Sequence, residues 1–188
     1  MYHHFKLYKP YGYLSQFVYN LKRKKKLLGD LYTFPEGTMA IGRLDEDSEG
    51  LLLLTTDGKM SEAVRSKKVE KEYYAQVDGI ITEEAVNQLK NGVAIGYKGT
   101  KYTTLPCKAS IVTAPADFPE RGKKIRDERH GPTSWVSIIV SEGKFRQVRK
   151  MTAAVGYPTL RLIRVRIGEI YLGNLQPGEV INIDNFIL

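Results

Sequence analysis

The most restrictive feature of the sequence is a short apolar run that directly follows an acidic cluster. Residues 51–54 are all leucine, and Thr55 ends the run. A nearly continuous apolar run of this length is typical of a β-strand that is buried on both faces. We therefore expect residues 51–55 to form a central strand of a sheet that is covered on each side.

The rest of the chain alternates between strand-like and helix-like segments without a regular βαβ rhythm. Thr82 is a suitable N-cap for a helix over residues 82–90, and Gly92 follows its last turn. Many strands with interspersed helices predict an α+β fold with a largely antiparallel or mixed sheet. The other expected strands are 2–8, 39–44, 72–77, 102–112, 135–140, 159–167 and 179–185, and the other expected helices are 59–65 and 144–155.

Length and composition predict a globular protein of modest size. A chain of 188 residues fits one compact domain over residues 1–188, or two tightly joined subdomains. The chain has no apolar run of about 18 residues that could span a bilayer, and its first residues lack an apolar signal core. Cys107, the single cysteine, has no disulfide partner within the chain. We expect a soluble, cytoplasmic protein.

The charge indicates a polyanionic partner. Lys and Arg number 29 against 21 Asp and Glu, which leaves a net charge of +8 and a pI near 9.4. Such a balance favours nucleic acid, although a solvated basic surface is the alternative. A basic run at residues 22–26 and an irregular loop at residues 114–132 are the candidate phosphate contacts. Their cations include Lys24, Lys25, Lys123, Lys124, Arg126 and Arg129.

The strongest local motif is the acidic turn at residues 42–50, which lies between two expected strands. A solvated turn explains its glycines but does not explain the neighbouring Arg43. A calcium loop fails on spacing, because Thr56 stands where a bidentate glutamate is needed. The role of Asp45 in this turn stays open until a partner is found.

The helix expected at residues 144–155 offers such a partner. Helical periodicity puts Phe145, Val148 and Met151 on one face, which should pack on the sheet. Arg149 falls at the border of that face, where a half-buried guanidinium needs a carboxylate and would hold it ionised. A basic helix face that touches phosphate is the alternative reading, and both can hold at once if Arg146 and Lys150 face RNA.

The strand at residues 72–77 begins with two adjacent tyrosines. Alternation sends Tyr73 and Tyr74 to opposite sides of the sheet, so that one can lie in the core while the other stacks on a base. The three histidines have no metal-ligand spacing, and the sequence has no glycine-rich phosphate loop. We therefore expect neither a metal nor a nucleotide cofactor.

At these residues the sequence resembles the pseudouridine synthases of the ribosomal small-subunit synthase A family. Residues 42–52 resemble its catalytic block, residues 71–73 its Lys-x-Tyr strand, and residues 142–151 its Glu-Gly-x-x-Arg-Gln-Val-Arg helix. Lys9 and Pro10 match its N-terminal turn. The likeness covers nearly the whole chain, and its three motifs occur in order.

Three further segments are most similar to those of one branch of the family, which modifies the large ribosomal subunit and lacks an N-terminal S4 domain. These segments are residues 47–50, 132–135 and 156–164. Two departures are visible, because Tyr8 and Phe145 stand where asparagine is common in the family. Phe145 could therefore alter the contacts with RNA.

The resemblance implies a single catalytic domain over residues 1–188, with a bent, mixed and largely antiparallel sheet, flanking helices and a central cleft, in which two subdomains can share the sheet. It implies an enzyme that isomerises a uridine of 23S rRNA, or of a large-subunit precursor, to pseudouridine without a cofactor. We also expect a monomer. The resemblance implies that Asp45 is the catalytic carboxylate, that Arg149 pairs with it, and that Tyr73 packs against the flipped uracil. Asp45 would attack C1′ or take a proton from C2′. The candidate RNA contacts are Arg43, Lys71, Lys144, Arg146, Lys150, Lys9, Lys24, Lys25, Lys123, Lys124 and Arg126.

Two other functions compete with this one. A non-catalytic rRNA-binding protein could keep the fold, although the set of Asp45, Tyr73 and Arg149 argues against it. A carboxylate-based glycoside hydrolase could use Asp45 and Asp47 as its acid pair, but the basic surroundings disfavour a sugar substrate.

Overall fold

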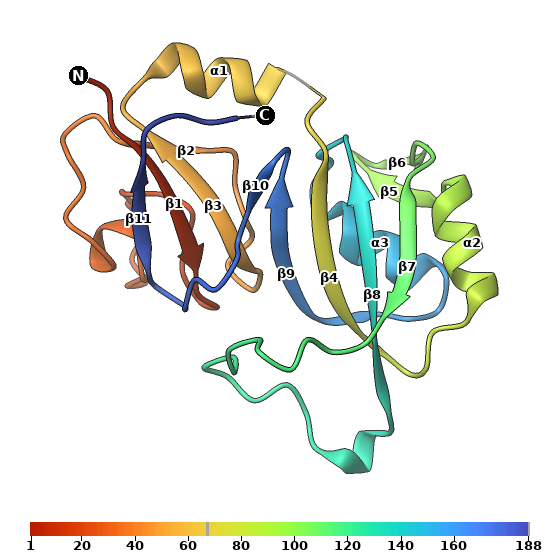
Figure 1. The fold of residues 1–188 in the computed structure, drawn as a ribbon. Coiled ribbons are helices and arrows are strands. Elements are labelled where there is room, and N and C mark those ends of the chain that lie inside the picture. Colours follow the sequence, from red (N-terminus) through yellow and green to blue (C-terminus); the bar gives the residue numbers. More distant parts are fainter. Residues whose placement is uncertain (67, 188) are drawn as a thin grey trace. The chain divides into compact units, whose positions relative to one another are not determined.

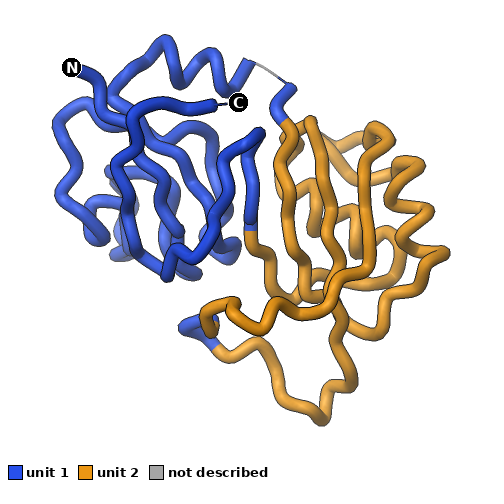
Figure 2. Tube along the Cα trace, viewed as in Figure 1, with its two compact units in different colours: residues 1–69, 121–123, 164–188 blue, residues 70–120, 124–163 orange. Residues whose placement is uncertain are grey.

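The computed structural model describes residues 1–66 and 68–187, which form two compact units (Figure 1). The first unit comprises residues 1–69, 121–123 and 164–188, and the second comprises residues 70–120 and 124–163 (Figure 2). Strand β9, Thr159–Ile167, contributes its first residues to the second unit and its last residues to the first.

In the first unit the buried strand expected at residues 51–55 is β3, Glu49–Thr55, and every one of its residues is buried. Strand β1, His4–Lys9, pairs with β3 on one side and with β11, Val180–Ile183, on the other, both antiparallel. Phe5, Leu7, Leu28, Leu52 and Leu54 form a buried hydrophobic cluster in this unit. The remaining elements are a short 3-10 helix η1, Leu28–Asp30, strands β2, Met39–Ile41, and β10, Ile170–Tyr171, and helix α1, Gly58–Ser66.

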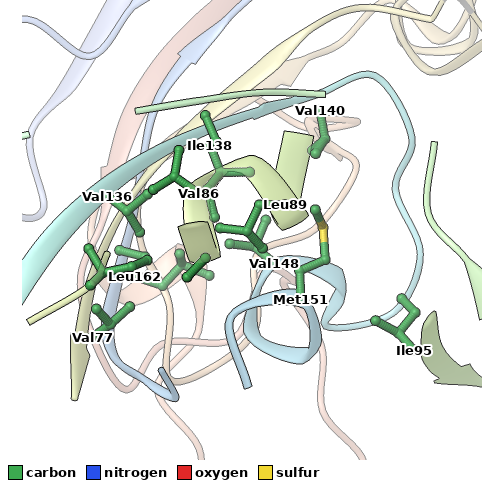
Figure 3. Close-up of a cluster of buried hydrophobic side chains, with 14 residues drawn as sticks. Val77, Val86, Leu89, Ile95, Val136, Ile138, Val140, Val148, Met151 and Leu162 are labelled. Carbon is green, nitrogen blue, oxygen red and sulfur yellow. The ribbon is translucent and has the colours of Figure 1, made fainter. Parts of the chain in front are cut away.

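In the second unit the strand order is β9-β4-β8-β7, where β4 is Lys71–Asp78, β7 is Lys108–Val112 and β8 is Thr133–Val140. A hairpin of β5, Ala94–Tyr97, and β6, Thr100–Thr103, forms a separate small sheet. Helices α2, Glu83–Asn91, and α3, Gln147–Ala154, bury their apolar sides in the core shown in Figure 3. A second 3-10 helix, η2, is Glu128–His130.

The predicted α+β class and the largely antiparallel sheet are confirmed. The limits of α2 are confirmed as well, because the Thr82 hydroxyl accepts the Ala85 N–H at 3.3 Å and Gly92 ends the helix. The β9 strand has the predicted bounds of residues 159–167. These segments carry their signals locally, in caps and in β-branched composition.

Two predicted elements are wrong in detail. The strand expected over residues 102–112 is divided into β6 and β7; Pro106, which has no N–H to donate to a strand ladder, lies in the break. The helix expected from residue 144 begins at Gln147, because Arg146 has a φ of 52°, which is not helical. Phe145 is therefore not on the core face of α3, and its side chain is 67% exposed.

The end of α2 gives a test of this packing. Gly92 has a φ of 92°, and a Cβ there would lie 2.2 Å from the carbonyl oxygen of Thr104. Gly156 follows α3 with a φ of 89°, but a Cβ there would meet nothing within 4 Å. We expect Gly156→Ala to lower the free energy of unfolding by about 1–2 kcal/mol for its backbone conformation, and Gly92→Ala by about 3 kcal/mol or more because the clash adds to it.

Urea denaturation of the two variants and the wild type measures both losses. The two substitutions share the same sign of φ and the same added methyl group, so their difference combines the contact with Thr104 and the extended ψ of 141° at Gly92. Equal losses would show that the second unit shifts to relieve the clash at no cost.

Candidate active site

The acidic loop of the first unit, defined as residues 42–48, connects β2 to β3 and is fixed by backbone and hydroxyl contacts. The Ser15 hydroxyl donates to the Leu44 carbonyl at 2.8 Å and accepts the Leu44 N–H at 2.9 Å. The Gly12 N–H donates to the Glu46 carbonyl at 2.8 Å, and a turn closes between the Ser48 N–H and the Asp45 carbonyl at 3.0 Å. Asp45 therefore stands half-buried between two anchored positions.

Lys9 supports the same loop from inside the unit. Its side chain is 0% exposed, and its ammonium donates to the carbonyls of Pro10 at 2.9 Å and Tyr13 at 2.7 Å, with the Glu46 carbonyl at 3.5 Å. A fully buried ammonium that is bound to carbonyl groups has no surface to offer a phosphate. The prediction that Lys9 contacts RNA is therefore wrong, and its role is to hold the acidic loop.

The charge of Lys9 is set by two opposing effects. Burial lowers the pKa of Lys9 from 10.5 to about 8, because the low-polarity interior disfavours the ammonium form. The nearby carboxylates favour the ammonium form and oppose this fall, but burial is the larger effect. These carboxylates, in decreasing order of influence, are Glu49, Asp47, Asp45 and Glu46.

A second cation joins the basic run at residues 22–26 to the acidic loop. The Lys25 ammonium lies 2.8 Å and 2.9 Å from the two carboxylate oxygens of Glu46, and its side chain is 24% exposed. Lys25 therefore serves the fold of the first unit, whereas Lys22, Arg23 and Lys24 are exposed. A phosphate contact by Lys24 stays a prediction.

The loop over residues 114–132 also contains cations with different surroundings. Arg126 donates to the Asp78 carboxylate at 2.9 Å and to the Gly131 and Pro132 carbonyls at 3.2 Å and 2.8 Å, and its side chain is only 14% exposed. Arg126 closes the base of the loop, and its contact with phosphate stays a prediction.

The tip of this loop belongs to the first unit. The Lys123 ammonium lies 5.8 Å and the Arg121 guanidinium 4.6 Å from the centre of the Tyr11 ring. Lys123, Lys124 and Arg43 are all exposed. Their contacts with RNA stay predictions.

The tyrosines of β4 divide as alternation predicts. Tyr73 is half-buried and packs against the core of the second unit. The Tyr74 ring lies 5.6 Å from the Phe118 ring in the loop over residues 114–132. Lys71, the first residue of β4, is half-buried.

Helix α3 has the sidedness that its sequence predicts. Val148, Met151 and Thr152 are buried, and Arg149 is half-buried at the border of the apolar face. Because Asp45 belongs to the first unit and Arg149 and Tyr73 to the second, the grouping of the three in one site stays a prediction.

Sequence analysis missed two supporting residues, of which Glu142 carries a signal and Ser15 does not. Ser15 lies 29 residues before Leu44 in the sequence, and nothing in its neighbourhood indicates the contact. Glu142 has a conspicuous place in the motif at residues 142–151, where its carboxylate accepts the Tyr102 hydroxyl, the Leu105 N–H and the Gln147 amide. Glu142 therefore ties α3 to the segment after β6.

Other kinds of site are not indicated. Within residues 1–66 and 68–187, no group of three or more His, Cys, Asp or Glu side chains could hold a metal ion. No helix in that part of the chain is both long and apolar enough to cross a membrane.

Comparison with known proteins defines the class. The sequence profile of RNA pseudouridylate synthases matches residues 3–154, so the chain belongs to this family of RNA uridine isomerases. The ribosomal large subunit pseudouridine synthase E of Vibrio parahaemolyticus is 43% identical over 173 residues, which cover 91% of this chain and 69% of that protein. The protein of the same name from Xanthomonas campestris is 40% identical and covers 92% and 91% of the two chains.

A solved structure agrees with the sequence comparison. A crystal structure of a pseudouridylate synthase superposes with a TM-score of 0.75 at 27% identity, over 97% of this chain and 70% of that one. The resemblance drawn from the motifs is thereby confirmed, and the glycoside hydrolase alternative is wrong.

The pKa of Lys9 predicts how stability depends on pH. The folded state releases this proton near pH 8, whereas an unfolded lysine holds it to about 10.4. The contribution of Lys9 to the free energy of unfolding therefore rises with pH between these values, because the folded state loses the proton and no longer buries a charge. Relative to Lys9→Met, we expect the wild type to gain about 3 kcal/mol across that interval.

Urea denaturation at pH 7, 8, 9 and 10.5 measures this difference. The other lysines and tyrosines titrate in both proteins and cancel, so only the slope of the difference matters. Parallel curves for the wild type and Lys9→Met would contradict the buried ammonium.

Proposed function

We propose that this chain isomerises a uridine of large-subunit rRNA to pseudouridine, with Asp45 as the catalytic carboxylate. The observation that carries the proposal is the identity of 40% or more to two proteins named ribosomal large subunit pseudouridine synthase E, over 91% and 92% of this chain. The proposal includes action as a monomer in the cytoplasm, where ribosomal subunits are assembled.

The reaction needs an ionised carboxylate and no redox partner. The bond between N1 and C1′ breaks, the uracil turns while it stays bound, C5 bonds to C1′, N1 gains a proton and C5 loses one. Asp45 can attack C1′ or take a proton from C2′ as the glycosidic bond fails. The anchoring of the acidic loop by Ser15, Gly12 and Lys9 supports this role, because a carboxylate that acts on one atom must be held in place.

Two residues of the second unit complete the proposed site. Arg149 pairs with Asp45 and keeps it ionised, which its half-buried place at the border of α3 supports. Tyr73 packs against the extruded uracil, and the contact of its ring with the core of the second unit would hold the ring still. Extrusion of a paired base costs a few kcal/mol, which stacking on Tyr73 offsets in part.

Substitution of Asp45 tests the chemistry. RNA whose uracils carry tritium at C5 releases the label only when C5 becomes the attachment point. We expect release with the wild type and at least a thousandfold less, on the order of other lost nucleophiles, with Asp45→Asn. The matched control is Asp47→Asn, which removes one carboxylate from the same loop and should stay within about tenfold of the wild type.

Full release by Asp45→Asn would contradict the catalytic assignment. Absence of release by the wild type on rRNA would instead favour the non-catalytic rRNA-binding alternative.

Removal of exposed charges tests the path of the RNA in the first unit. The variant that changes Lys22, Arg23 and Lys24 to Gln leaves the Lys25–Glu46 ion pair intact. If these three side chains contact phosphates, the slope of log affinity against log salt should fall by about 2 to 3. The control changes Lys59, Arg65 and Lys68 to Gln, three exposed cations in and after α1, and should keep a slope within about 1 of the wild type. Equal slopes in the two variants would remove residues 22–24 from the interface.

A further inference from the structure

A group of cations and rings in the second unit lies outside the proposed catalytic set. We name it the hairpin patch and define it as Tyr97, Lys98, Lys144, Phe145 and Lys150. It brings together hairpin β5–β6 and the start of α3, which pack beside each other.

The contacts within the hairpin patch join each cation to a ring. The Lys144 ammonium lies 4.9 Å from the centre of the Tyr97 ring and 4.9 Å from that of Tyr102. The Lys98 ammonium lies 5.4 Å from the Tyr97 ring. The Lys150 ammonium lies 5.3 Å from the Phe145 ring and donates to the Gly96 carbonyl at 2.8 Å.

The surrounding charge is strongly positive. Residues 94–103 and 142–151 hold six cations and one acid, for a net charge of +5. The acid, Glu142, accepts hydrogen bonds from three neighbours that are themselves uncharged. The cations are Lys98, Lys101, Lys144, Arg146, Arg149 and Lys150. Such a field attracts phosphate.

The backbone adds an independent observation. Among the described residues, the two non-glycine residues with positive φ are Lys98, at 49°, and Arg146, at 52°. Lys98 and Gly99 form a two-residue turn between Tyr97 and Thr100, with positive φ at both positions, which strongly favours asparagine before glycine. A lysine and an arginine in such conformations cost stability, and strain of this kind marks functional positions.

We propose that the hairpin patch binds RNA next to the target uridine, with its cations on phosphates and the Phe145 ring stacked on an unpaired base. Phe145 suits this role because it is 67% exposed and has the Lys150 ammonium against its ring. Base stacking on an exposed ring is tolerant of sequence, so the patch supplies affinity rather than the choice of base. This inference rests on the proposed function as an RNA-modifying enzyme, and it specifies which surface of that enzyme binds the RNA.

Three full-length variants test it by filter binding to a 23S rRNA transcript over a range of salt concentrations. Lys98→Asn should weaken binding about threefold to tenfold and lower the salt slope by about 1, with an unchanged or higher Tm because asparagine suits the turn. Phe145→Ala should weaken binding about fivefold or more with an unchanged salt slope, because stacking releases no counterion.

Lys101→Gln is the matched control. It removes the same charge from the same hairpin, but strand alternation directs Lys101 away from the face that carries Tyr102. We expect its affinity to stay within about twofold of the wild type. Wild-type affinity and salt slope in both Lys98→Asn and Phe145→Ala would overturn the proposal, as would an equal loss in Lys101→Gln and Lys98→Asn.

Tritium release separates this proposal from the proposed function. Normal release together with unaltered binding in both variants would overturn the hairpin patch alone. Binding that depends on the hairpin patch without release by the wild type would overturn the enzymatic function alone.

Discussion

The organisation of the first unit depends on one buried ammonium beneath a cluster of acids. Lys9 ends β1, and its three carbonyl neighbours come from its own turn and from the acidic loop. Without this cation, four carboxylates would repel one another in the loop that carries the proposed catalytic Asp45. Burial of an ammonium costs several kcal/mol, and the fall in the pKa of Lys9 shows that the carboxylates offset this cost only in part.

This arrangement connects the β-sheet to the proposed chemistry. β1 and β3 pair from His4 opposite Thr55 to Lys9 opposite Gly50, so the register places Lys9 beside the point where the acidic loop enters β3. A slip by one residue would turn Lys9 to the other face and remove the counter-charge. The four leucines of β3 are identical and all buried, so they do not distinguish this register from one shifted by a residue. The polar contacts at the two ends of the pairing do so: the His4 ring lies 2.9 Å from the Thr55 hydroxyl, and Lys9 reaches the acidic loop. Hydrophobic burial in the strand and charge placement in the loop are thus two results of one pairing.

Sequence reasoning succeeds where the signal is local and fails where a distant group decides. The leucine run, the Thr82 cap and the border position of Arg149 follow from periodicity and capping within a few residues. The distant partners of three cations, by contrast, could not be read from the sequence. These cations are Lys9, Lys25 and Arg126, and their charge alone suggests RNA binding. Each one is held by carbonyls or a carboxylate from another segment, and only tertiary structure brings those partners together.

The error at Phe145 has a single backbone cause with a chemical consequence. Helical periodicity puts this residue in line with Val148 and Met151, and an uninterrupted helix would bury it. Because Arg146 is left-handed, α3 begins at Gln147, three residues later than expected, and Phe145 is free of the apolar face. One strained residue therefore converts a core position into an exposed ring flanked by cations. The strain of Arg146 and the exposure of Phe145 therefore have a common origin in this backbone conformation.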